Sequence, residues 1–595
     1  MVLLLKRLLV IVDIILGGNY RIKAREDEVM SGINGFNWAD RELLSRMNEC
    51  IRHRGPDGEG VFINDHISLG HVKITAIDSI EKGKQPMHNK DESIWIIFDG
   101  KIYNSLLLKK KIEEKGFSLN SKNDTELILY AYEKNGTEAF EYFNGEFAFC
   151  LYDSKNKCIY LVRDRLGIKP LYYYYTGNKF IFSSEIKTFH ILLECSFDLD
   201  ENAVLEYFLT RNISSESFFK NIKTVEPGCY IKFDLINNKV SKCTYFDVLH
   251  VVSKNQFMRN YDNTEKRLIE ELDILLNNVV KDQFVSEIPV GTICSGGVDS
   301  SLLTAIAKKY TNDLKIFNVK VDDAFLDESK YAKKVAKHLG LQIIEEVLDK
   351  EKFIELYKNC IYLADLPFVH PNSIGIHLIN KRAKREGINV ILAGEGADEL
   401  FGGYEHYKYF YRRLLLTKTP ILNFFNNKLR GFFYFNDFTG YMLEDANYLL
   451  KHYKDLPIND VRRSAYQIFY EMLEFLKDNF EREMTAYILK DMKYYLPPTL
   501  REAERMAMGA GVEIRMPYLD NRIVDFASNL PLKFKVNFFK TKYLLKKVAE
   551  RYLPKDIVYR KKMGFGIPTE KWLGDKSLDF KKVMYTDWEK IFCSC

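Results

Sequence analysis

The first part of the chain, from about Met30 to Asn237, consists mainly of short runs in which apolar and polar residues alternate. Asn, Gly and Asp residues separate these runs, a pattern typical of antiparallel strands joined by turns. The runs with this pattern are residues 61–72, 92–104, 147–153, 157–164 and 170–185. Two other stretches predict helices. Residues 41–55 repeat apolar positions every three or four residues, and residues 124–136 open on an acidic turn and close at a glycine.

The second part of the chain, from about Lys266 to the end, alternates strands with helices. Strand-like apolar runs occupy residues 289–294, 315–321 and 389–394, and helical patterns occupy residues 300–310, 328–340 and a stretch from about residue 371. This order predicts a parallel sheet with helices on both faces, followed by a mainly helical region after Tyr404. The polar, irregular residues 238–265 predict a linker, so we expect domains at residues 30–237 and 266–595.

Length and composition are consistent with this division. A chain of 595 residues is too long for one hydrophobic core. Its net charge of +5, from 87 basic and 82 acidic residues, is nearly neutral for this size and indicates neither nucleic acid nor a membrane as a partner. Ten scattered cysteines, with no C-x-x-C pair, argue against a disulfide framework or a zinc site and favour a reducing cytoplasm.

The N-terminal residues 1–29 contain an apolar run that Lys6, Arg7 and Asp13 interrupt. The run is too short to cross a bilayer, and no small-x-small cleavage site follows it. We therefore expect an N-terminal extension that is either a translated upstream segment, absent from the mature chain, or a short surface helix. No other stretch is long and apolar enough to cross a membrane.

Small and hydroxyl-bearing residues follow the predicted strand at 289–294. Ser295, Gly296 and Gly297 leave their backbone N–H groups open to an anion, and the next helix adds its positive N-terminus. The hydroxyl of Ser300 is a further donor, and together these groups predict a pyrophosphate cradle. Because the Asp299 carboxylate would repel phosphate, the pattern also predicts a bridging Mg²⁺. The stretch is not a Walker loop, and a plain capped strand-to-helix turn is the alternative.

A second strand end carries an unusual set of acids. The stretch LAGEGADELFGGYEHY, at residues 392–407, places Glu395, Asp398 and Glu399 among four glycines. Acidic residues are common in the first turn of a helix, but that explains only one or two of the three. Crowded carboxylates repel each other, so metal or proton chemistry is expected to compensate them.

These two stretches and several later ones resemble the asparagine synthetase family, in the order of that family. The resemblance covers nearly all of residues 31–573 and rests on SGGVDSS, GEGADELFGGY and residues 325–340, 504–522, 542–547 and 560–573. It implies an α/β parallel-sheet ATP-pyrophosphatase domain with a helical C-terminal part. In such a domain ATP activates a carboxylate as an acyl-adenylate, pyrophosphate leaves, and ammonia attacks.

The resemblance assigns roles to matching residues in the second domain. The pyrophosphate would be held by Ser295, Gly296, Gly297, Asp299 and Ser300. Asp299 and Asp398 would hold Mg²⁺, while Val319 and Gly394 would hold adenine and ribose through backbone groups.

Three further residues of this domain bear on the chemistry. Glu395 would take a proton from the attacking ammonia, and Lys542 would stabilise the departing pyrophosphate. Glu504 departs from the family, which usually has Asp there, and the change is expected to retune the pocket for the acid substrate.

The first domain resembles a class II glutamine amidotransferase, which implies an α+β four-layer αββα (Ntn-type) fold. RHRGPDGEG, NDTE and RDRLGIKPLYY carry this likeness. The family's nucleophile is an N-terminal Cys whose own α-amine acts as the base. Ser31 stands in that place here, and a serine hydroxyl ionises far less readily than a thiol. The chain as written also holds the Ser31 nitrogen in a peptide bond.

Three more positions of the glutamine site depart from the family. Asp99 replaces an Asn that would donate to the oxyanion hole, and Lys73 replaces an Arg that would grip the glutamine carboxylate with two donors. Lys101 replaces a Glu. Asp124, expected to bind the glutamine amine, and Gly100, expected to complete the oxyanion hole, are retained. The combined changes predict that glutamine hydrolysis is weak or lost.

The leading hypothesis is therefore an ATP- and Mg²⁺-dependent ligase that acts on aspartate and uses free ammonia or another amine, with the first domain as a structural partner. One alternative is a tailoring ligase of the same family that joins another carboxylate to an amine. A non-catalytic scaffold is the alternative of another class, and the complete phosphate and metal set counts against it. By family analogy alone, the chain is expected to be able to form a homodimer.

Overall fold

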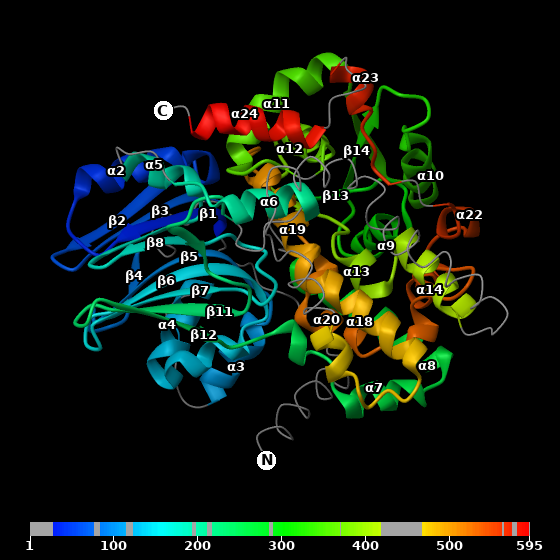
Figure 1. Cartoon of the computed structure of the whole chain (residues 1–595), viewed down its shortest axis with the longest axis horizontal. Coiled ribbons are helices and arrows are strands. Elements are labelled where there is room, and N and C mark those ends of the chain that lie inside the picture. Colours follow the sequence, from blue (N-terminus) through cyan, green and yellow to red (C-terminus); the bar gives the residue numbers. More distant parts are fainter. Residues whose placement is uncertain are drawn as a thin grey trace.

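The computed structural model places two domains side by side (Figure 1). It describes residues 28–75, 84–114, 119, 123–192, 198–210, 217–284, 289–368, 370–417, 467–561, 564–573 and 580–593. Residues 1–27 of the expected N-terminal extension lie outside this set. In the part of the chain that is described, no helix has the length and apolar character needed to span a bilayer.

The N-terminal domain is built on two stacked antiparallel sheets. The first has the order β10 (Ile222–Thr224), β8 (Tyr172–Thr176), β9 (Lys179–Ser183), β1 (Glu28–Phe36), β3 (Ile67–Thr75) and β2 (Gly58–Asn64). The second has the order β12 (Lys239–Thr244), β11 (Cys229–Asp234), β7 (Cys158–Arg163), β6 (Gly145–Asp153), β5 (Ile94–Ile102) and β4 (Met87–His88). Inward-facing apolar residues such as Ile33, Leu69, Ile97 and Leu161 form the core between the sheets.

Helices cover the outer faces of both sheets and complete the four-layer αββα fold (Figure 1). They are α2 (Arg41–Cys50) and α5 (Phe189–Leu192) on one side and α3 (Ser105–Glu114) and α4 (Asp124–Asn135) on the other, with α6 (Glu201–Thr210) near the second domain. The two predicted helices are confirmed. Asp40 caps α2 and Asn123 caps α4 by accepting hydrogen bonds from backbone N–H groups, and α4 ends at Gly136.

The second domain contains a five-stranded parallel sheet with helices on both faces. The strand order is β15 (Gln342–Leu348), β14 (Lys315–Val321), β13 (Val290–Ile293), β16 (Val390–Leu392) and β17 (Glu513–Arg515). The chain goes from β13 outward to β14 and β15, and then returns to add β16 on the other side of β13. The order therefore reverses between β13 and β16, and in open α/β sheets ligands bind at the carboxyl ends of such strands.

Helices make up most of the remaining described residues of this domain. They are α8 (Glu265–Gln283), α9 (Val298–Ala307), α10 (Ser329–Leu339), α11 (Lys350–Ala364), α12 (Ser373–Arg385), α13 (Ala397–Phe401), α14 (Glu405–Thr417), α18 (Asn479–Tyr494), α19 (Leu496–Met508), α20 (Asn521–Ser528), α21 (Tyr543–Ala549), α22 (Lys555–Val558), α23 (Thr569–Leu573) and α24 (Phe580–Phe592).

The structure differs from the sequence-based interpretation in a few elements. Residues 238–265, interpreted as an irregular linker, contain β12, which pairs with β11, and the helix α7 (Lys254–Tyr261). β12 is an edge strand whose side chains are exposed or half-buried, so it lacks the apolar alternation that marks a strand. The strands β15 and β17 were also not predicted, because β15 is interrupted by Glu345 and Glu346 and β17 has only three residues.

The two domains share apolar packing as well as charges. The C-terminal helix α24 runs along α11 (Figure 1). Its Trp588 is fully buried, lies with its ring centroid 4.9 Å from that of Phe218 of the N-terminal domain, and donates a hydrogen bond to Asp365 O. This helix is therefore part of the second domain in the sequence, but it packs against both domains.

Candidate functional site

The predicted turns after β13 and β16 meet at the strand-order reversal. A Cβ atom built on Gly394 would lie 3.2 Å from the Ser300 backbone nitrogen of α9, so the turn after β16 lies close to the start of this helix. The Tyr518 hydroxyl, which follows β17, donates a hydrogen bond of 3.1 Å to Asp299 O. Three neighbouring strands thus bring their carboxyl ends to one place.

The turn after β13 has the form of an anion nest. Gly296 has φ +75°, which an L residue rarely adopts, and the Gly297 N–H turns back to the Ser295 hydroxyl at 3.3 Å. The Ser300 hydroxyl accepts from Ser295 N at 3.3 Å. Helix α9 begins at Val298 with no side-chain cap, so the positive end of its dipole faces the nest.

Asp299 and Asp398, one from each turn, converge on a single cation. Lys542 Nζ pairs with Asp299 Oδ2 and, at 2.7 Å, with Asp398 Oδ1. Burial lowers the pKa of Lys542, but the two carboxylates outweigh this effect and raise it above its usual value. Two carboxylates that contact one nitrogen are close enough to share an ion.

The surroundings of this ion pair are shaped to hold it. Lys542 itself has φ +53°, a left-handed conformation that costs a non-glycine residue energy and is common at functional sites. A Cβ atom on Gly403 would lie 2.1 Å from Asp398 Oδ1 and 1.9 Å from Lys542 Cε, so only glycine fits there. The last glycine of GEGADELFGGY thus makes room for the Lys542–Asp398 contact.

The Asp299–Asp398 pair also fits a divalent cation. Asp299 Oδ1 is buried and carries no hydrogen bond in the described part of the chain, so one lone pair faces the site unused. Carboxylate oxygens are the ligands that Mg²⁺ prefers, and it commonly takes one or two of them plus phosphate oxygens and water. Among the described residues, no group of three or more His, Cys, Asp or Glu side chains could hold a metal ion.

The three acids of the second turn lie in different environments. Glu399 is buried, and burial followed by the charge of Asp398 raises its pKa to about 8. It accepts a hydrogen bond of 2.7 Å from the Tyr404 hydroxyl. Glu395 is only half-buried and lies at the open start of α13. Near neutral pH one of the three carboxyl groups is thus largely protonated, which reduces the repulsion expected from the sequence.

Val319 lies in the carboxyl half of β14, next to β13 in the sheet. It is half-buried and packs near Gly375 of α12. Its backbone is at the same sheet edge as the nest, where the resemblance assigns it to the adenine.

Sequence reasoning missed three residues at this site, although all lie in the motifs that carried the resemblance. They are Gly403, which makes room for the ion pair, Tyr518, which holds the Asp299 backbone, and Arg560, which donates a hydrogen bond of 2.7 Å to Gly296 O. No spacing rule connects residue 560 with residue 296, so only the folded chain assigns Arg560 a place.

In the N-terminal domain, Ser31 lies within β1 rather than at a free chain start. β1 begins at Glu28, and Ser31 pairs with Lys73 of β3. The Ser31 side chain is buried, and its hydroxyl donates to Phe98 O and to Asp99 Oδ1, both at 3.2 Å. Its nitrogen is a peptide nitrogen of a paired strand, so in this form of the chain it cannot act as a base.

The retained Asp124 is already paired within the protein. Its Oδ2 lies 3.1 Å from Lys101 Nζ and accepts from Ile102 N at 3.0 Å. Lys101 is one of the residues that depart from the family, and its ammonium lies where the resemblance expects the amine of glutamine. Gly100, expected at the oxyanion hole, lies beside it in β5.

Asp99 and Glu504 differ from the family pattern and lie in different domains, and both contact the guanidinium of Arg54. Arg54 Nη2 lies 3.0 Å from Asp99 Oδ2 and 2.5 Å from Glu504 Oε1, and all three side chains are fully buried. The expectation that Glu504 retunes the acid-substrate pocket stays untested, and its contacts here are with Arg54 and Lys169. Glu504 points from α19 across the domain interface, where the longer side chain reaches Arg54.

This trio is part of a larger buried group, here called the interface charge cluster. Its cations are Arg54, Lys169, Lys187 and Arg505, and its anions are Asp99, Glu185, Asp365 and Glu504. Burial raises the pKa of Glu185, but His53, Lys187 and Arg505 outweigh it and hold that pKa well below its usual value. The predicted glutamine site is thus continuous with an ionic contact between domains.

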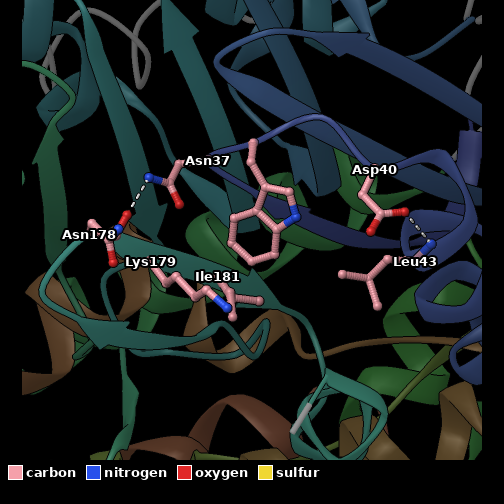
Figure 2. Close-up of a pocket in the computed structure, with 7 residues that line it drawn as sticks. Asn37, Asp40, Leu43, Asn178, Lys179 and Ile181 are labelled. Atoms are coloured by element: carbon pink, nitrogen blue, oxygen red, sulfur yellow. Dashed lines mark hydrogen bonds between the residues drawn. The ribbon is translucent and has the colours of Figure 1, made fainter.

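A separate surface pocket of about 540 Å³ lies beside α2 and the β8–β9 turn (Figure 2). Trp38 forms its aromatic wall, with Lys179 Nζ 5.6 Å from the ring centroid. Its polar groups serve the local structure: Asn37 donates to Asn178 O, and Asp40 caps α2 (Figure 2). No predicted site residue lines this pocket.

Comparison with known proteins gives a consistent result. A sequence model described as asparagine synthase matches residues 271–588, and one described as a glutamine amidotransferase domain matches residues 30–246. Asparagine synthetase [glutamine-hydrolyzing] 1 of Bacillus subtilis is 32% identical over 561 residues, which cover 89% of this chain and 85% of that protein. Putative asparagine synthetase [glutamine-hydrolyzing] 2 of Methanocaldococcus jannaschii is 36% identical over 419 residues, covering 66% and 79%. Amidase chyE of Penicillium rubens is 25% identical over 584 residues, covering 89% and 85%.

Proposed function

Because this chain belongs to the asparagine synthase family of ATP-dependent ligases, we propose that it activates aspartate as an acyl-adenylate and transfers the acyl group to ammonia. The observation that carries the proposal is the convergence of Asp299, Asp398 and Lys542 beside an uncapped anion nest at the strand-order reversal. This arrangement suits a nucleotide whose phosphates need both a cation and backbone donors.

The first step forms a bond between a carboxylate oxygen of aspartate and the α-phosphorus of ATP, and breaks the bond to pyrophosphate. Backbone N–H groups of the nest and Lys542 oppose the charge that develops on the leaving oxygens. The backbone at Val319 and Gly394 positions adenine and ribose. A Mg²⁺ ion held by Asp299 and Asp398 would neutralise phosphate charge.

The second step forms the amide. Ammonia attacks the acyl carbon, the bond to AMP breaks, and a proton leaves the nitrogen. Glu395 is the proposed acceptor of that proton, since it is the half-buried carboxylate at the open start of α13.

We further propose that this chain hydrolyses glutamine weakly or not at all. Three contacts support the proposal: the Ser31 hydroxyl is tied to Asp99, Asp99 is an anion paired with Arg54, and Asp124 is paired with Lys101. An anion at the oxyanion position would repel the developing negative charge instead of stabilising it. The nitrogen is therefore expected to come from free ammonia or another amine.

The test measures pyrophosphate release by the full-length chain with MgATP and aspartate, with either ammonium or glutamine as the nitrogen source. We expect turnover with ammonium and, with glutamine, a rate below about 1% of it, since loss of an oxyanion donor alone costs about 10²–10³ in rate. Brisk release of glutamate from glutamine would overturn the second proposal and leave the first intact.

A second candidate is a ligase of the same family that activates another carboxylate and joins it to another amine. The relative named an amidase, which matches most of this chain, favours keeping it. A panel of acids and amines with pyrophosphate as the readout separates the two, because only the aspartate ligase would prefer aspartate and ammonium. Absence of ATP–pyrophosphate exchange with every acid would instead favour a scaffold.

Location and assembly are also proposals. We propose a cytoplasmic location, which the unpaired state of every cysteine in the described ranges supports. The homodimer implied by the resemblance can be tested by light scattering of the purified chain.

A further inference from the structure

The segment that begins at Arg560 carries a motif to which the proposed chemistry assigns no role, yet Arg560 lies against the nest. Its Nε donates to Gly296 O at 2.7 Å, and its Nη1 lies 2.6 Å from Glu328 Oε1. The guanidinium lies over the ring of Tyr331, 4.6 Å from the centroid. The Arg560 and Glu328 side chains are only 8% and 9% exposed, so their ion pair is buried and is not a surface ion pair.

These contacts fix the direction of the remaining nitrogen of the guanidinium. A Cβ atom on Gly297 would lie 3.6 Å from Arg560 Nη2, so Nη2 lies beside the nest. None of the hydrogen bonds among the described residues uses Nη2. Because the guanidinium is planar, holding Nε and Nη1 also holds Nη2, with two N–H donors beside the backbone groups of the nest.

The charges around the nest favour an additional hydrogen-bond donor for a bound anion. Lys542 divides its charge between Asp299 and Asp398, so a second cationic donor beside the nest would add to its effect on the pyrophosphate oxygens. A pyrophosphate group has many acceptor oxygens, and arginine binds such oxygens with planar, directed donors.

We propose that Arg560 binds the pyrophosphate moiety of ATP through Nη2 and so completes the anion nest of Ser295–Gly297. This inference rests on the proposed function and deepens it, since it names a phosphate-binding residue in the C-terminal segment. Glu328 and Tyr331 are then positioning residues: Glu328 holds the guanidinium by an ion pair, and Tyr331 holds it by stacking.

The test compares the full-length wild type with Arg560→Lys, Glu328→Gln and Lys571→Gln. Lysine keeps the charge beside Glu328 but cannot contact Glu328, Gly296 O and an anion together. Lys571 is the matched control, because it lies in the same C-terminal segment and pairs with Asp323 at the surface. The readouts are the Kd for magnesium pyrophosphate by calorimetry and the KM values for ATP and for the acid.

We expect Arg560→Lys to raise the Kd for pyrophosphate and the KM for ATP about tenfold, as for the loss of one charge-assisted hydrogen bond, with the KM for the acid within about twofold. Glu328→Gln should give a smaller change of the same kind, and it tests the proposal should Arg560→Lys fold poorly. Lys571→Gln should bind as the wild type does.

Two failures are distinguishable. If Arg560→Lys and Glu328→Gln bind magnesium pyrophosphate as tightly as the wild type, the Arg560 assignment is wrong and the proposed function stands. If the wild type itself binds neither magnesium pyrophosphate nor MgATP, the proposed function fails and the assignment fails with it.

Discussion

At the scale of single residues, two buried cations each bring together carboxylates that would otherwise repel. Lys542 joins Asp299 to Asp398 at the nest, and Arg54 joins Asp99 to Glu504 at the domain interface. The first pair belongs to the site for which we propose nucleotide binding. The second belongs to the interface charge cluster, in which Lys169 Nζ also lies 3.8 Å from Asp99 and 3.9 Å from Glu504.

Glu146 of β6 provides a prediction about pH. It is buried between the domains and accepts a hydrogen bond of 2.9 Å from Met516 N, and burial raises its pKa from 4.5 to about 7. At pH values between these two pKa values, Glu146 keeps its proton in the folded chain and loses it in the unfolded chain. Stability should therefore fall as pH rises from about 4.5 through about 7, by on the order of 3 kcal/mol, and stay at the lower level above that range.

Urea unfolding of the wild type and Glu146→Gln between pH 4.5 and 8 isolates this effect. Glutamine keeps the acceptor for Met516 N but does not titrate, so the difference between the two proteins should change across the range. Replacing the exposed Glu113 by glutamine is the control. A wild-type and Glu146→Gln difference that is independent of pH would contradict the prediction.

At the scale of elements, the site is made of strand ends, while two helices of the second domain contribute much of its contact with the first domain. The carboxyl ends of β13 and β16 supply the nest and the acidic turn, and α21 begins directly after Lys542. The interface instead uses α19, which carries Glu504 and Arg505, and the C-terminal helix α24.

Helix α24 gives a prediction about packing. Trp588→Ala removes a fully buried ring that contacts Phe218 and donates to Asp365 O, and should lower the free energy of unfolding by about 3–5 kcal/mol. Lys590→Ala on the exposed face of the same helix should change it by less than about 0.5 kcal/mol. Equal urea midpoints for the two variants would show that α24 does not hold the domains together.

The sequence predicts local features of this molecule well and long-range pairings poorly. The nest, the acidic turn and α2 and α4 follow from neighbouring residues, since caps, glycines and periodicity act over a few positions. The strand β15 was missed because charged residues interrupt its apolar pattern. The shared contact of Asp99 and Glu504 with Arg54 could not be predicted at all, because each residue was recognised only as a departure and nothing in the local sequence links either of them to Arg54.

At the scale of the whole molecule, the interface charge cluster contains both Asp99 and Glu504. From the sequence these were two unrelated differences from the family pattern. Eight side chains with balanced charge are buried where a glutamine site would meet the synthetase domain. Buried ion pairs contribute little net stability, but removing one partner is costly because a buried charge is left alone. The N-terminal domain therefore contacts the second domain through a buried ionic interface whose disruption should be costly.

Arg54→Met should show this cost. It leaves Asp99, Glu185 and Glu504 without their shared cation and should lower the free energy of unfolding by about 3–5 kcal/mol. Adding Glu504→Gln should restore part of the loss, because it removes one of the uncompensated charges.

Arg52→Met is the matched control, since Arg52 is two residues away and its side chain is 40% exposed. Among the described residues its ion pairs are with the exposed Glu49 and Glu59 side chains. Urea midpoints of the four proteins decide the matter. If Arg54→Met and Arg52→Met behave alike, or if the second change gives no recovery, the cluster does not couple the domains.

The balance of charge in the cluster is achieved only across the domain boundary. The N-terminal domain supplies three cations and two anions, and the second domain supplies one cation and two anions, so each half carries an unmatched charge of opposite sign. Consider a chimera in which one domain comes from a relative with asparagine at position 99 and aspartate at position 504. The buried charges at its domain interface would no longer balance. Exchange of one domain alone would therefore leave a buried charge without a counter-charge at the interface, so these domains should be exchangeable between relatives only as a pair.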